Sequence, residues 1–464
     1  MADLELSFVK SNKGKDLLVH GGFQYKQNVK RGSVVYWKCA ESTPCPGRAK
    51  TDGETLTVTQ EHTHEPNIVR IESTRQLKNA LKERALVSQD SPTELFADGT
   101  AKEPDVVTAQ LVKERVAEQM RYARRVRGTH SRVEDSLEEL VFSTKDTETI
   151  NGEKFLLFDS GPGEERTLMF ATQENLQFLA THRNWIADGT FKVVPSQFHQ
   201  LYTIHAVVGS SSYACVFILM SKRTKKAYKT AFEVLKAELG EMVRPETIMT
   251  DYEQAAIGAF EAVFPGAVQN GCFFHYSQAL YRKLQTLPDL CEQYSKDRNV
   301  LHHLKMFNAL AFSDRVEQAF TDMKELPFFR SDDEQLLEYI EYFERTWIGA
   351  VRKPKYAPEK WNCREAVLKG LPKTSNNVEG WHNAFAHLVG ASHPNIWKFL
   401  EKLRKQQRLT EQSFQELKQG RVPARRKADN NRTILLPRIV QQQEAHPADN
   451  IEYLKALSNH LIGA

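Results

Sequence analysis

The first 60 residues of the chain contain short runs in which hydrophobic and polar side chains alternate. A period of two is typical of a β-strand, because successive side chains of a strand point to opposite faces. The runs lie at residues 22–25, 33–38 and 55–59, with glycine and proline between them. We therefore predict a small β-rich unit over residues 1–68.

Residues 69–152 follow a helical pattern instead. Leucines four positions apart predict one helix over residues 69–87, and a second amphipathic helix is expected to end near Arg127. The polar residues 88–105 between them predict a linker. We expect the whole region to be a helical connection to the rest of the chain.

From about residue 153 strand-like and helix-like patterns alternate. Three strand-like runs in succession, followed by helix, strand, helix and strand, predict an α/β fold with a mixed central sheet. Residues 276–420 are then mostly helical by pattern. The expected strands are residues 155–158, 166–171, 185–194, 201–208, 213–220, 247–250 and 268–274, and the expected helices before residue 276 are 173–181, 225–239 and 254–264.

Composition adds that the chain can fold and that its charge is unevenly distributed. Hydrophobic residues make up 41% of the 464 residues and charged residues 26%, which excludes wholesale disorder. Residues 1–133 and residues 401–464 each carry a net charge of +5, whereas the middle carries −6. Basic ends around an acidic centre are typical of arms that grip a polyanion, although such offsets also occur in proteins without that function.

We expect neither a membrane-spanning segment nor the disulfide framework of a small secreted protein. The N-terminus lacks the apolar core of a signal peptide, and the most apolar stretch, residues 213–220, is far shorter than the ~20 residues that span a bilayer. The six cysteines show no dense even spacing. We predict an intracellular protein whose thiols are reduced.

Two basic clusters, at residues 121–127 and 421–427, are candidates for nuclear import or for binding phosphate. The first makes residues 69–152 a basic helical linker and a predicted DNA-binding region. Short clusters of this kind are also found as merely solvated surfaces. The predicted DNA-binding side chains are Arg121, Arg124, Arg125, Arg127, Arg425, Arg426 and Lys427.

Two cysteines and two histidines within the β-rich unit have spacing that suits a metal ion. Five residues separate Cys39 from Cys45, and one separates His62 from His64. Two thiolates and two imidazoles form the closed tetrahedral set of a structural zinc site. A unit this small needs such a ligand, because its core is limited. The spacing alone also allows these four residues to be incidental.

The surrounding aromatic residues make this pattern specific, and it closely resembles the FLYWCH-type zinc finger. The resemblance implies zinc bound by Cys39, Cys45, His62 and His64, and a role in binding DNA or protein. Leu18 is a candidate for the leucine of the motif. The matching residues, in order, are Phe23, Tyr25, Tyr36, Trp37, Lys38, Cys39, Cys45, Gly47, Arg48, His62 and His64; we expect Phe23, Tyr25 and Trp37 to pack in the core.

Two aspartates stand where the strand pattern predicts burial. Asp188 interrupts the apolar strand 185–194, and Asp251 directly follows the strand 247–250. A buried aspartate is costly unless it is paired or binds a metal, and open α/β sheets bind ligands at strand ends. Taken singly, each is also explained as a capping or turn residue.

Glu379 is a candidate third acid. It follows Thr374 to Asn377, whose side chains are suited to cap a helix running toward Val389. A glutamate near a helix N-terminus also has an ordinary explanation in its favourable interaction with the helix dipole.

The order of the three acids on this pattern resembles the ribonuclease H-like transposase core and, more closely, the Mutator-like element (MULE) transposase family. Four ordered motifs carry the resemblance: ADGTFK around Asp188, TDYEQA around Asp251, CFFH at residues 272–275, and TSNNVEGWHNAF around Glu379. It implies a ribonuclease H-like core over residues 153–410.

The residues between Asp251 and Glu379 are too many for one connection, so we expect a helical insertion at about residues 277–373, and residues 411–464 form a basic C-terminal tail. The resemblance also implies a catalytic role for Asp188, Asp251 and Glu379 as ligands of two Mg²⁺ or Mn²⁺ ions in the cleavage and joining of DNA strands.

Further residues lie near this triad in the sequence. The family match implies a catalytic, site-organising role for His275, beside Cys272; alternatively, Cys272 packs as a small apolar residue and His275 caps locally. His382 lies one turn from Glu379 on the same helical face. Glu253 is a rival third acid, less suited because it lies two positions after an aspartate.

Two functions remain open at this stage. The first is a DNA transposase or endonuclease that performs two-metal phosphodiester cleavage and strand transfer at transposon ends. The second is a zinc-dependent DNA-binding transcription or chromatin factor, derived from a transposase, with an idle catalytic core. Both predict a nuclear protein that binds double-stranded DNA, and the first leaves room for a homo-oligomer on the DNA.

Overall fold

The computed structural model describes residues 7–10, 15–41, 45–64, 66, 68–88, 90–109, 111–127, 136–240, 243–349, 353–421, 435–443 and 449–462. The chain divides into two compact units, Met1–Val133 and Glu134–Ala464. Within the described residues, no helix has both the length and the hydrophobicity that a membrane crossing needs.

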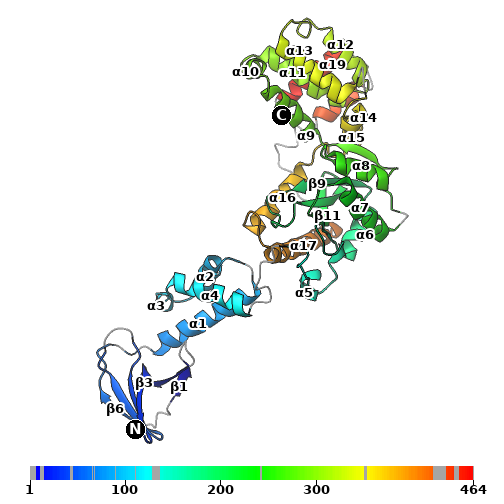
Figure 1. Cartoon of the computed structure of the whole chain (residues 1–464). Coiled ribbons are helices and arrows are strands. Elements are labelled where there is room, and N and C mark those ends of the chain that lie inside the picture. Colours follow the sequence, from blue (N-terminus) through cyan, green and yellow to red (C-terminus); the bar gives the residue numbers. More distant parts are fainter. Residues whose placement is uncertain are drawn as a thin grey trace. The chain divides into compact units, whose positions relative to one another are not determined.

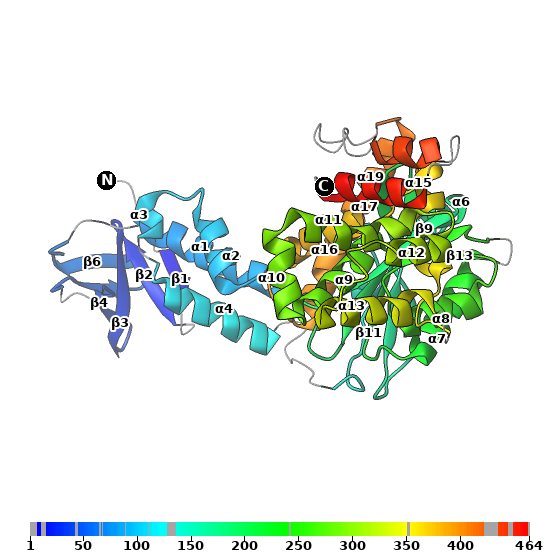
Figure 2. The same cartoon turned by 90° about the horizontal axis from the view of Figure 1, so that it is seen from above.

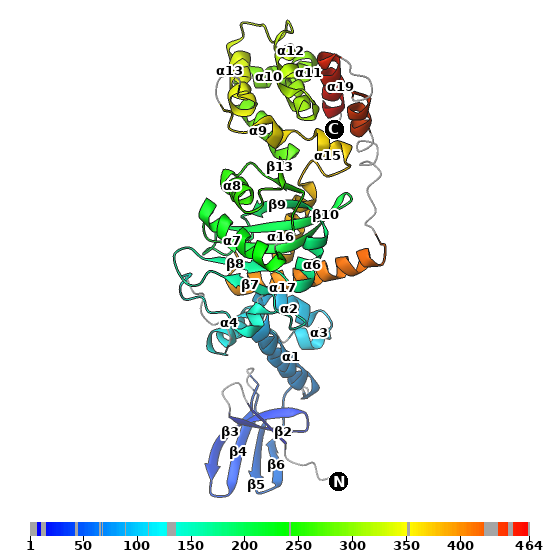
Figure 3. The ribbon, with the colours of Figure 1, turned by 90° about the vertical axis from the view of Figure 1, so that its right-hand side faces the viewer.

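The first unit begins with a six-stranded antiparallel sheet whose strands neighbour one another in chain order (Figure 3). Its core is small and consists of Leu18, Tyr25, Trp37 and Ala49, with three partly buried residues around them. The predicted β-rich unit is therefore present. The strands are β1 (Ser7–Lys10), β2 (Asp16–His20), β3 (Phe23–Arg31), β4 (Val34–Cys39), β5 (Arg48–Asp52) and β6 (Thr55–Gln60).

Four helices complete this unit and have a hydrophobic core of their own, which includes Leu81 and Met120. The expected linker at residues 88–105 is wrong, because Ser91 and Glu94 form a reciprocal capping box that starts a helix there. The helices are α1 (Ile68–Val87), α2 (Pro92–Thr100), α3 (Asp105–Thr108) and α4 (Lys113–Arg127).

The second unit is built around a seven-stranded mixed sheet in the order β13–β12–β9–β10–β11–β8–β7. Strands β7 to β11 pair antiparallel, whereas β12 runs parallel to both β9 and β13. This confirms the predicted α/β class with a mixed sheet. The strands are β7 (Leu156–Asp159), β8 (Thr167–Phe170), β9 (Asn184–Thr190), β10 (Gln200–Val208), β11 (Ser211–Met220), β12 (Thr247–Thr250) and β13 (Val268–Gly271).

Helices cover both faces of this sheet (Figure 1). On one face Trp185 and Ala187 pack with α6 (Gln173–Thr181), α7 (Lys225–Leu239) and α8 (Gln254–Val263). On the other face the strands pack with α16 (Asn376–Val389) and α17 (Ile396–Lys418). Because side chains alternate along β9, Ile186 and Asp188 lie on the α16 face, where Ile186 contacts Val378.

Between β13 and α16 the chain forms a group of helices with a separate, aromatic-rich core (Figures 1 and 2). The C-terminal helix α19 (Asn450–Ile462) packs against α11 and α12 and adds Leu454 and Leu457 to that core. A short helix, α5 (Thr144–Thr147), precedes the sheet. The group consists of α9 (Phe273–Gln285), α10 (Pro288–Lys296), α11 (Arg298–Ala309), α12 (Val316–Lys324), α13 (Glu334–Phe343), α14 (Pro358–Trp361) and α15 (Arg364–Leu368), with short 3₁₀ and π turns at η1 (Leu310–Phe312) and η2 (Glu344–Ile348).

Candidate functional site

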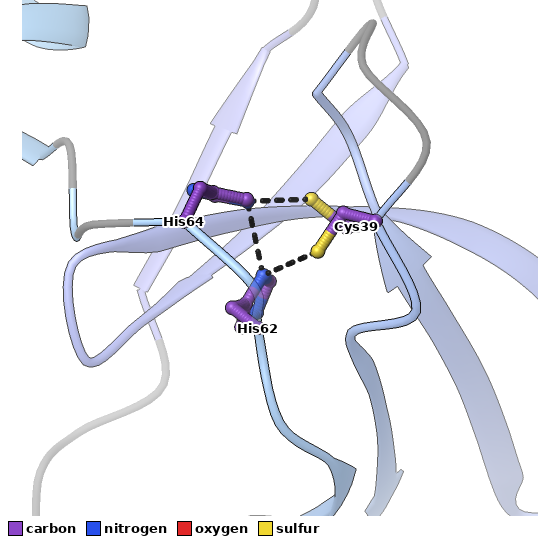
Figure 4. A group of neighbouring side chains, drawn as sticks. Cys39, His62 and His64 are labelled. Atoms are coloured by element: carbon purple, nitrogen blue, oxygen red, sulfur yellow. Dashed lines mark hydrogen bonds between the residues drawn. The ribbon is translucent and has the colours of Figure 1, made fainter.

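The four predicted finger ligands lie together. Cys39 ends β4, Cys45 lies in the loop before β5, and the two histidines follow β6. Their donor atoms all lie within 4.8 Å of one another. The sulfur of Cys45 is 3.3 Å from an imidazole nitrogen of His62. The sulfur of Cys39 is 3.3 Å from an imidazole nitrogen of His64, and the two imidazole nitrogens are 3.2 Å apart (Figure 4).

These distances fit a tetrahedral ion. Zinc bonds of about 2.0 Å to nitrogen and 2.3 Å to sulfur place tetrahedral donors about 3.3–3.8 Å apart. Two backbone amides also donate to the sulfurs, from Glu41 to Cys39 and from Gly47 to Cys45, each at 3.4 Å. Such bonds stabilise thiolates, which are the form that binds metal.

The electrostatics of the site favour the ligating forms at two positions. Although burial raises the pKa of the Cys45 thiol, the amides of Thr63 and Gly47 outweigh it and lower this pKa to about 7. Burial lowers the pKa of His62, which favours the neutral ring. Burial raises the pKa of Cys39, so this thiol needs a nearby cation to be charged at neutral pH.

The segment from Cys45 to Arg48 is shaped around the histidines. A Cβ atom at Gly47 would lie 2.6 Å from two atoms of the His62 ring, so only glycine leaves room for this imidazole. Arg48 fixes the same segment, because its guanidinium donates to the carbonyls of Cys45, Pro46 and Gly47.

The aromatic residues of the motif pack as expected. The ring of Phe23 stacks on His62 with centroids 3.8 Å apart, and Tyr25 meets the same imidazole edge-on at 4.9 Å. Trp37 is buried and its indole N–H donates to Thr51 Oγ1 at 2.9 Å. Phe23 and Tyr25 therefore orient the imidazoles, while Trp37 holds β4 to β5.

In the second unit, Asp188 is a buried acid within a strand. It is only 6% exposed, and the backbone N–H of Gly189 donates to its Oδ1 at 2.9 Å. Burial and then the charge of Asp251 raise its pKa to about 7, with Glu379 adding to the effect and His275 opposing it. Because burial and Asp251 destabilise the ionised form of Asp188, a cation beside this carboxylate would stabilise it.

Asp251 lies directly after β12, the strand that runs parallel to β9. Its Oδ1 accepts the backbone N–H of Glu253 at 3.1 Å, and burial raises its pKa. The rival acid Glu253 is already engaged, because Arg223 binds its carboxylate through two hydrogen bonds of 2.8 and 3.1 Å. Among the described residues, the arginine at this strand end binds Glu253 and not Asp251.

Glu379 lies in the first turn of α16, and two contacts tie the chain before this helix to the end of the sheet. The amide of Ser375 donates to the sulfur of Cys272 at 3.2 Å, and the amide of Phe273 donates to the carbonyl of Lys373 at 2.9 Å. The charge of Glu379 reaches Asp188, whose pKa it raises.

A series of side-chain contacts connects α16 to the sheet beside Asp188. The Nδ1 of His382 lies 3.8 Å from the Oδ2 of Asp188, and its Nε2 is 3.1 Å from the hydroxyl of Thr203. That hydroxyl lies 3.0 Å from the Nε2 of His205 and 3.3 Å from the backbone oxygen of Asp188. His382 and Thr203 thus fix the surroundings of this acid.

His275 lies in the first turn of α9, next to Cys272 at the end of the sheet. Burial alone would lower its pKa, but Cys272 and the charges of Asp188 and Asp251 outweigh burial and raise the pKa to about 9. Its buried Nδ1 has no hydrogen-bond partner among the described residues. This shift favours the protonated imidazole at neutral pH.

The two candidate sites differ in how closely their donors approach. Among the described residues, the finger holds the one group of three or more potential ligands close enough to bind a single ion. The charges of Asp251 and Glu379 raise the pKa of Asp188, but these three described acids do not form such a group.

The predicted DNA-binding arginines and lysine are only partly described. Arg121 is exposed on α4, whereas Arg124 donates to the carbonyls of Ala85, Ser88 and Asp90 and so ties α4 to the end of α1. The side chains of Arg125 and Arg127, and the whole of Arg425, Arg426 and Lys427, lie outside the described residues.

The structure adds a basic surface that the sequence reasoning missed. Lys26 lies opposite Lys38 across β3 and β4, and Lys50 lies opposite Tyr36 across β4 and β5. Directly opposed residues share a face, so these four side chains form one solvent-facing patch, here called the lysine face. Among the described residues, no acidic side chain is paired with these lysines. The period of two in the strands could have predicted that Tyr36 and Lys38 share a face.

Comparison with known proteins finds a match for the finger and another for part of the second unit. Residues 8–64 match the FLYWCH zinc finger domain, and residues 184–279 match the MULE transposase domain. The chain is 38% identical over 79 residues to FLYWCH-type zinc finger-containing protein 1 of Mus musculus, and 36% identical over 89 residues to the protein of the same name from Homo sapiens.

These matches cover 17% and 19% of the chain and only 12% of either relative, so they concern a domain and not a whole protein. A FLYWCH zinc finger domain with an assembled set of two cysteines and two histidines supports Zn²⁺ as its cofactor. The chain carries an N-terminal FLYWCH zinc finger domain followed by a MULE transposase domain, as its motifs predicted.

Proposed function

We propose that this protein is a DNA transposase or endonuclease that cleaves phosphodiester bonds and transfers strands at transposon ends. The observation that carries the proposal is the buried Asp188 in β9. The like charge of Asp251, at the end of the adjacent parallel strand, adds to burial in raising the pKa of Asp188. Two ionised acids buried side by side are unfavourable, because burial and repulsion both destabilise their charges. A reaction that needs bound cations explains why both acids are present.

The topology supports a ribonuclease H-like core. Three antiparallel strands in the order β11–β10–β9 are followed by β12 and β13, which run parallel to β9. This is the succession of strands and helices that the resemblance implied. We propose the domain boundaries inferred from the sequence on the same basis: finger 1–68, linker 69–152, core 153–410 and tail 411–464.

In this proposal Asp188, Asp251 and Glu379 hold two Mg²⁺ or Mn²⁺ ions, which would activate the attacking oxygen and stabilise the leaving one. The chain's own residues prepare that site. Thr203 and His382 contact Asp188, and Arg223 binds the rival acid Glu253. His275, whose pKa of about 9 favours the protonated imidazole, is suited to contact a phosphate near the scissile bond.

DNA binding in this proposal begins at the finger. Lys26 and Lys38 lie directly opposite each other, and like charges so placed are unfavourable unless a polyanion lies over them. Tyr36 is 40% exposed between Lys38 and Lys50 and offers an aromatic ring to the same ligand. We infer that the lysine face contacts the phosphates of double-stranded DNA and that the protein acts in the nucleus.

A second candidate is a DNA-binding transcription or chromatin factor with an idle core. The observation that favours it is that the three acids do not form a closed group of ligands among the described residues, whereas the finger ligands do. This candidate keeps the lysine face and the zinc site and needs no cleavage.

A nicking assay separates the two candidates. Purified protein is incubated with supercoiled plasmid in Mg²⁺ or Mn²⁺, and the conversion to open circles is followed. We expect Asp188→Asn, Asp251→Asn and Glu379→Gln each to lower the nicking rate by at least about 100-fold. Glu261→Gln, which removes an exposed acid on α8, is the matched control and keeps the wild-type rate.

Nicking that survives in all three variants would sink the proposal. A wild-type protein that binds the plasmid without nicking it, and loses binding in Cys39→Ser, would leave the second candidate.

A further inference from the structure

The helical group contains a cavity that the proposed reaction does not use. Its volume is about 310 Å³, at the small end of the range for ligand pockets. It is enclosed by α9, α10, α11 and α13, all within the second unit. The side chains that matter here are Phe274, Tyr281, Tyr294, Lys305 and Asn308.

The aromatic residues of this cavity are unusually exposed. Phe274 is 38% exposed and Tyr281 is 46% exposed, although both belong to the amphipathic helix α9. Tyr294 of α10 lies across from Tyr281, with ring centroids 6.2 Å apart and planes inclined by 52°. The rings are thus not stacked on one another and leave their faces to a third planar group.

One wall of the cavity is polar and basic. Lys305 is half buried on α11, and the described residues place no acid on its ammonium group. Next to it, the amide of Asn308 donates to the hydroxyl of Ser277 at 2.9 Å, which fixes that amide in place. A ligand here therefore meets aromatic faces on one side and a cation with an amide on the other.

The cavity begins close to the acidic site. Phe274 lies in the first turn of α9, and the amide of the N-cap residue Cys272 donates to the carbonyl of Thr250, the residue before Asp251, at 2.9 Å. DNA held at that site would pass the mouth of the cavity. Unstacked bases bind to aromatic side chains, and phosphates bind to lysine.

We propose that this cavity captures one unpaired nucleobase of the DNA bound at the acidic site. Phe274 and Tyr281 stack on the base, and Lys305 contacts its phosphate. This inference rests on the proposed function, because it takes DNA to be the molecule held at the acids.

The test compares two duplexes in a buffer without Mg²⁺ or Mn²⁺, so that no strand is cut. One duplex carries a single unpaired thymine, and the other carries an abasic residue at the same place. Their affinities for the full chain are measured by fluorescence anisotropy. We expect the thymine duplex to bind about 5- to 100-fold more tightly, which is the range for stacking one base.

Variants assign this preference to the cavity. Tyr281→Ala and Phe274→Ala are expected to reduce it to nearly one, and Tyr281→Phe is expected to keep it. Leu337→Ala is the matched control, because Leu337 is 47% exposed on α13 of the same helical group and does not line the cavity. Unfolding midpoints equal to that of the wild type show that the variants are folded.

The outcomes separate this inference from the proposed function. Equal affinity of the wild type for both duplexes, or a preference that persists in both alanine variants, would overturn base capture. Asp188→Asn is expected to abolish nicking and to leave the preference intact, so a loss of nicking activity and a loss of base capture are distinguishable.

Discussion

The donors of the finger come from a stretch of 26 residues on one sheet, whereas the three acids come from β9, the end of β12 and α16, between residues 188 and 379. The finger has a core of four fully buried apolar side chains, and its ligand group is assembled. The acids stand on a sheet with large hydrophobic cores on both faces, and their group is open.

This difference has a physical reason. In the finger the ion and the fold depend on each other, because the small core does not suffice alone. In the second unit the hydrophobic layers position the acids whether or not a cation is bound. A fold that depends on its metal and a group of acids positioned by hydrophobic packing therefore respond to different perturbations.

The largest expected effect is the removal of zinc. A zinc-selective chelator should unfold the finger, since structural zinc is worth about 10–16 kcal/mol in zinc-finger peptides. Hydrogen exchange should show β2 to β6 unprotected, with the sheet of the second unit unchanged. Cys39→Ser should reproduce this result and Cys291→Ser, a thiol outside the finger, should not. If β2 to β6 stay protected from exchange in chelator, the finger does not need zinc to fold and the proposed difference between the two units is wrong.

The opposite perturbation targets the core of the second unit. Phe217 is fully buried, and it stacks on Trp381 with centroids 5.6 Å apart. Phe217→Ala should lower the free energy of unfolding by about 3–5 kcal/mol, measured with urea, and leave zinc binding unchanged. Leu409→Ala, at an exposed site on α17, should change it by less than about 0.5 kcal/mol. A loss of zinc affinity in Phe217→Ala would show that the two units are coupled.

A smaller effect is expected from a single methyl group in the finger. Gly47→Ala places a Cβ 2.6 Å from the His62 ring, so that imidazole must move away from the other donors. We expect zinc affinity to fall by about 10- to 100-fold, as for disturbed supports of metal ligands, in a competition titration. The matched substitution Gly53→Ala, at a glycine with open space around it but a φ of +58°, tests backbone strain alone and should keep the affinity.

The smallest effect concerns pH and the second unit. Burial, and then the nearby His382, hold the pKa of His205 well below its usual 6.5. The unfolded chain therefore binds a proton that the folded chain refuses, and stability is lost as pH falls below about 6.5. We expect this histidine to cost about 1 kcal/mol between pH 7 and pH 5.5. His205→Asn should reduce that slope in urea unfolding, and an unchanged slope would contradict the assignment.

Much of this architecture could be predicted from hydrophobic periodicity. The helices at residues 173–181 and 225–239 and the strand at 247–250 have the predicted bounds. The strand expected at residues 268–274 ends at Gly271, because Cys272 is the N-cap of α9 and its two phenylalanines belong to that helix. Aromatic residues suit both elements, so the pattern could not decide between them.

In the finger, strand β5 escaped prediction because Arg48–Asp52 contains one strongly apolar position, Ala49, among polar ones. Ligand spacing and the aromatic motif were enough to assemble the zinc donors in advance. The supports of Asp188 were not predictable, since Thr203 and His205 are isolated polar residues in a mostly apolar strand and the sequence does not show what they contact. Only the pairing of β10 with β9 reveals that their side chains share a face with the acid.

The packing of α19 against α11 has a consequence for the order in which the chain folds during translation. The finger has left the ribosome long before the helices near residue 300, whereas Leu454 and Leu457 reach their places in the same helical core about 8–30 s after α11, at 5–20 residues per second. Until then, the part of α11 that packs against α19 is uncovered. A transcript truncated before residue 450 would yield a folded finger together with a helical group prone to aggregate.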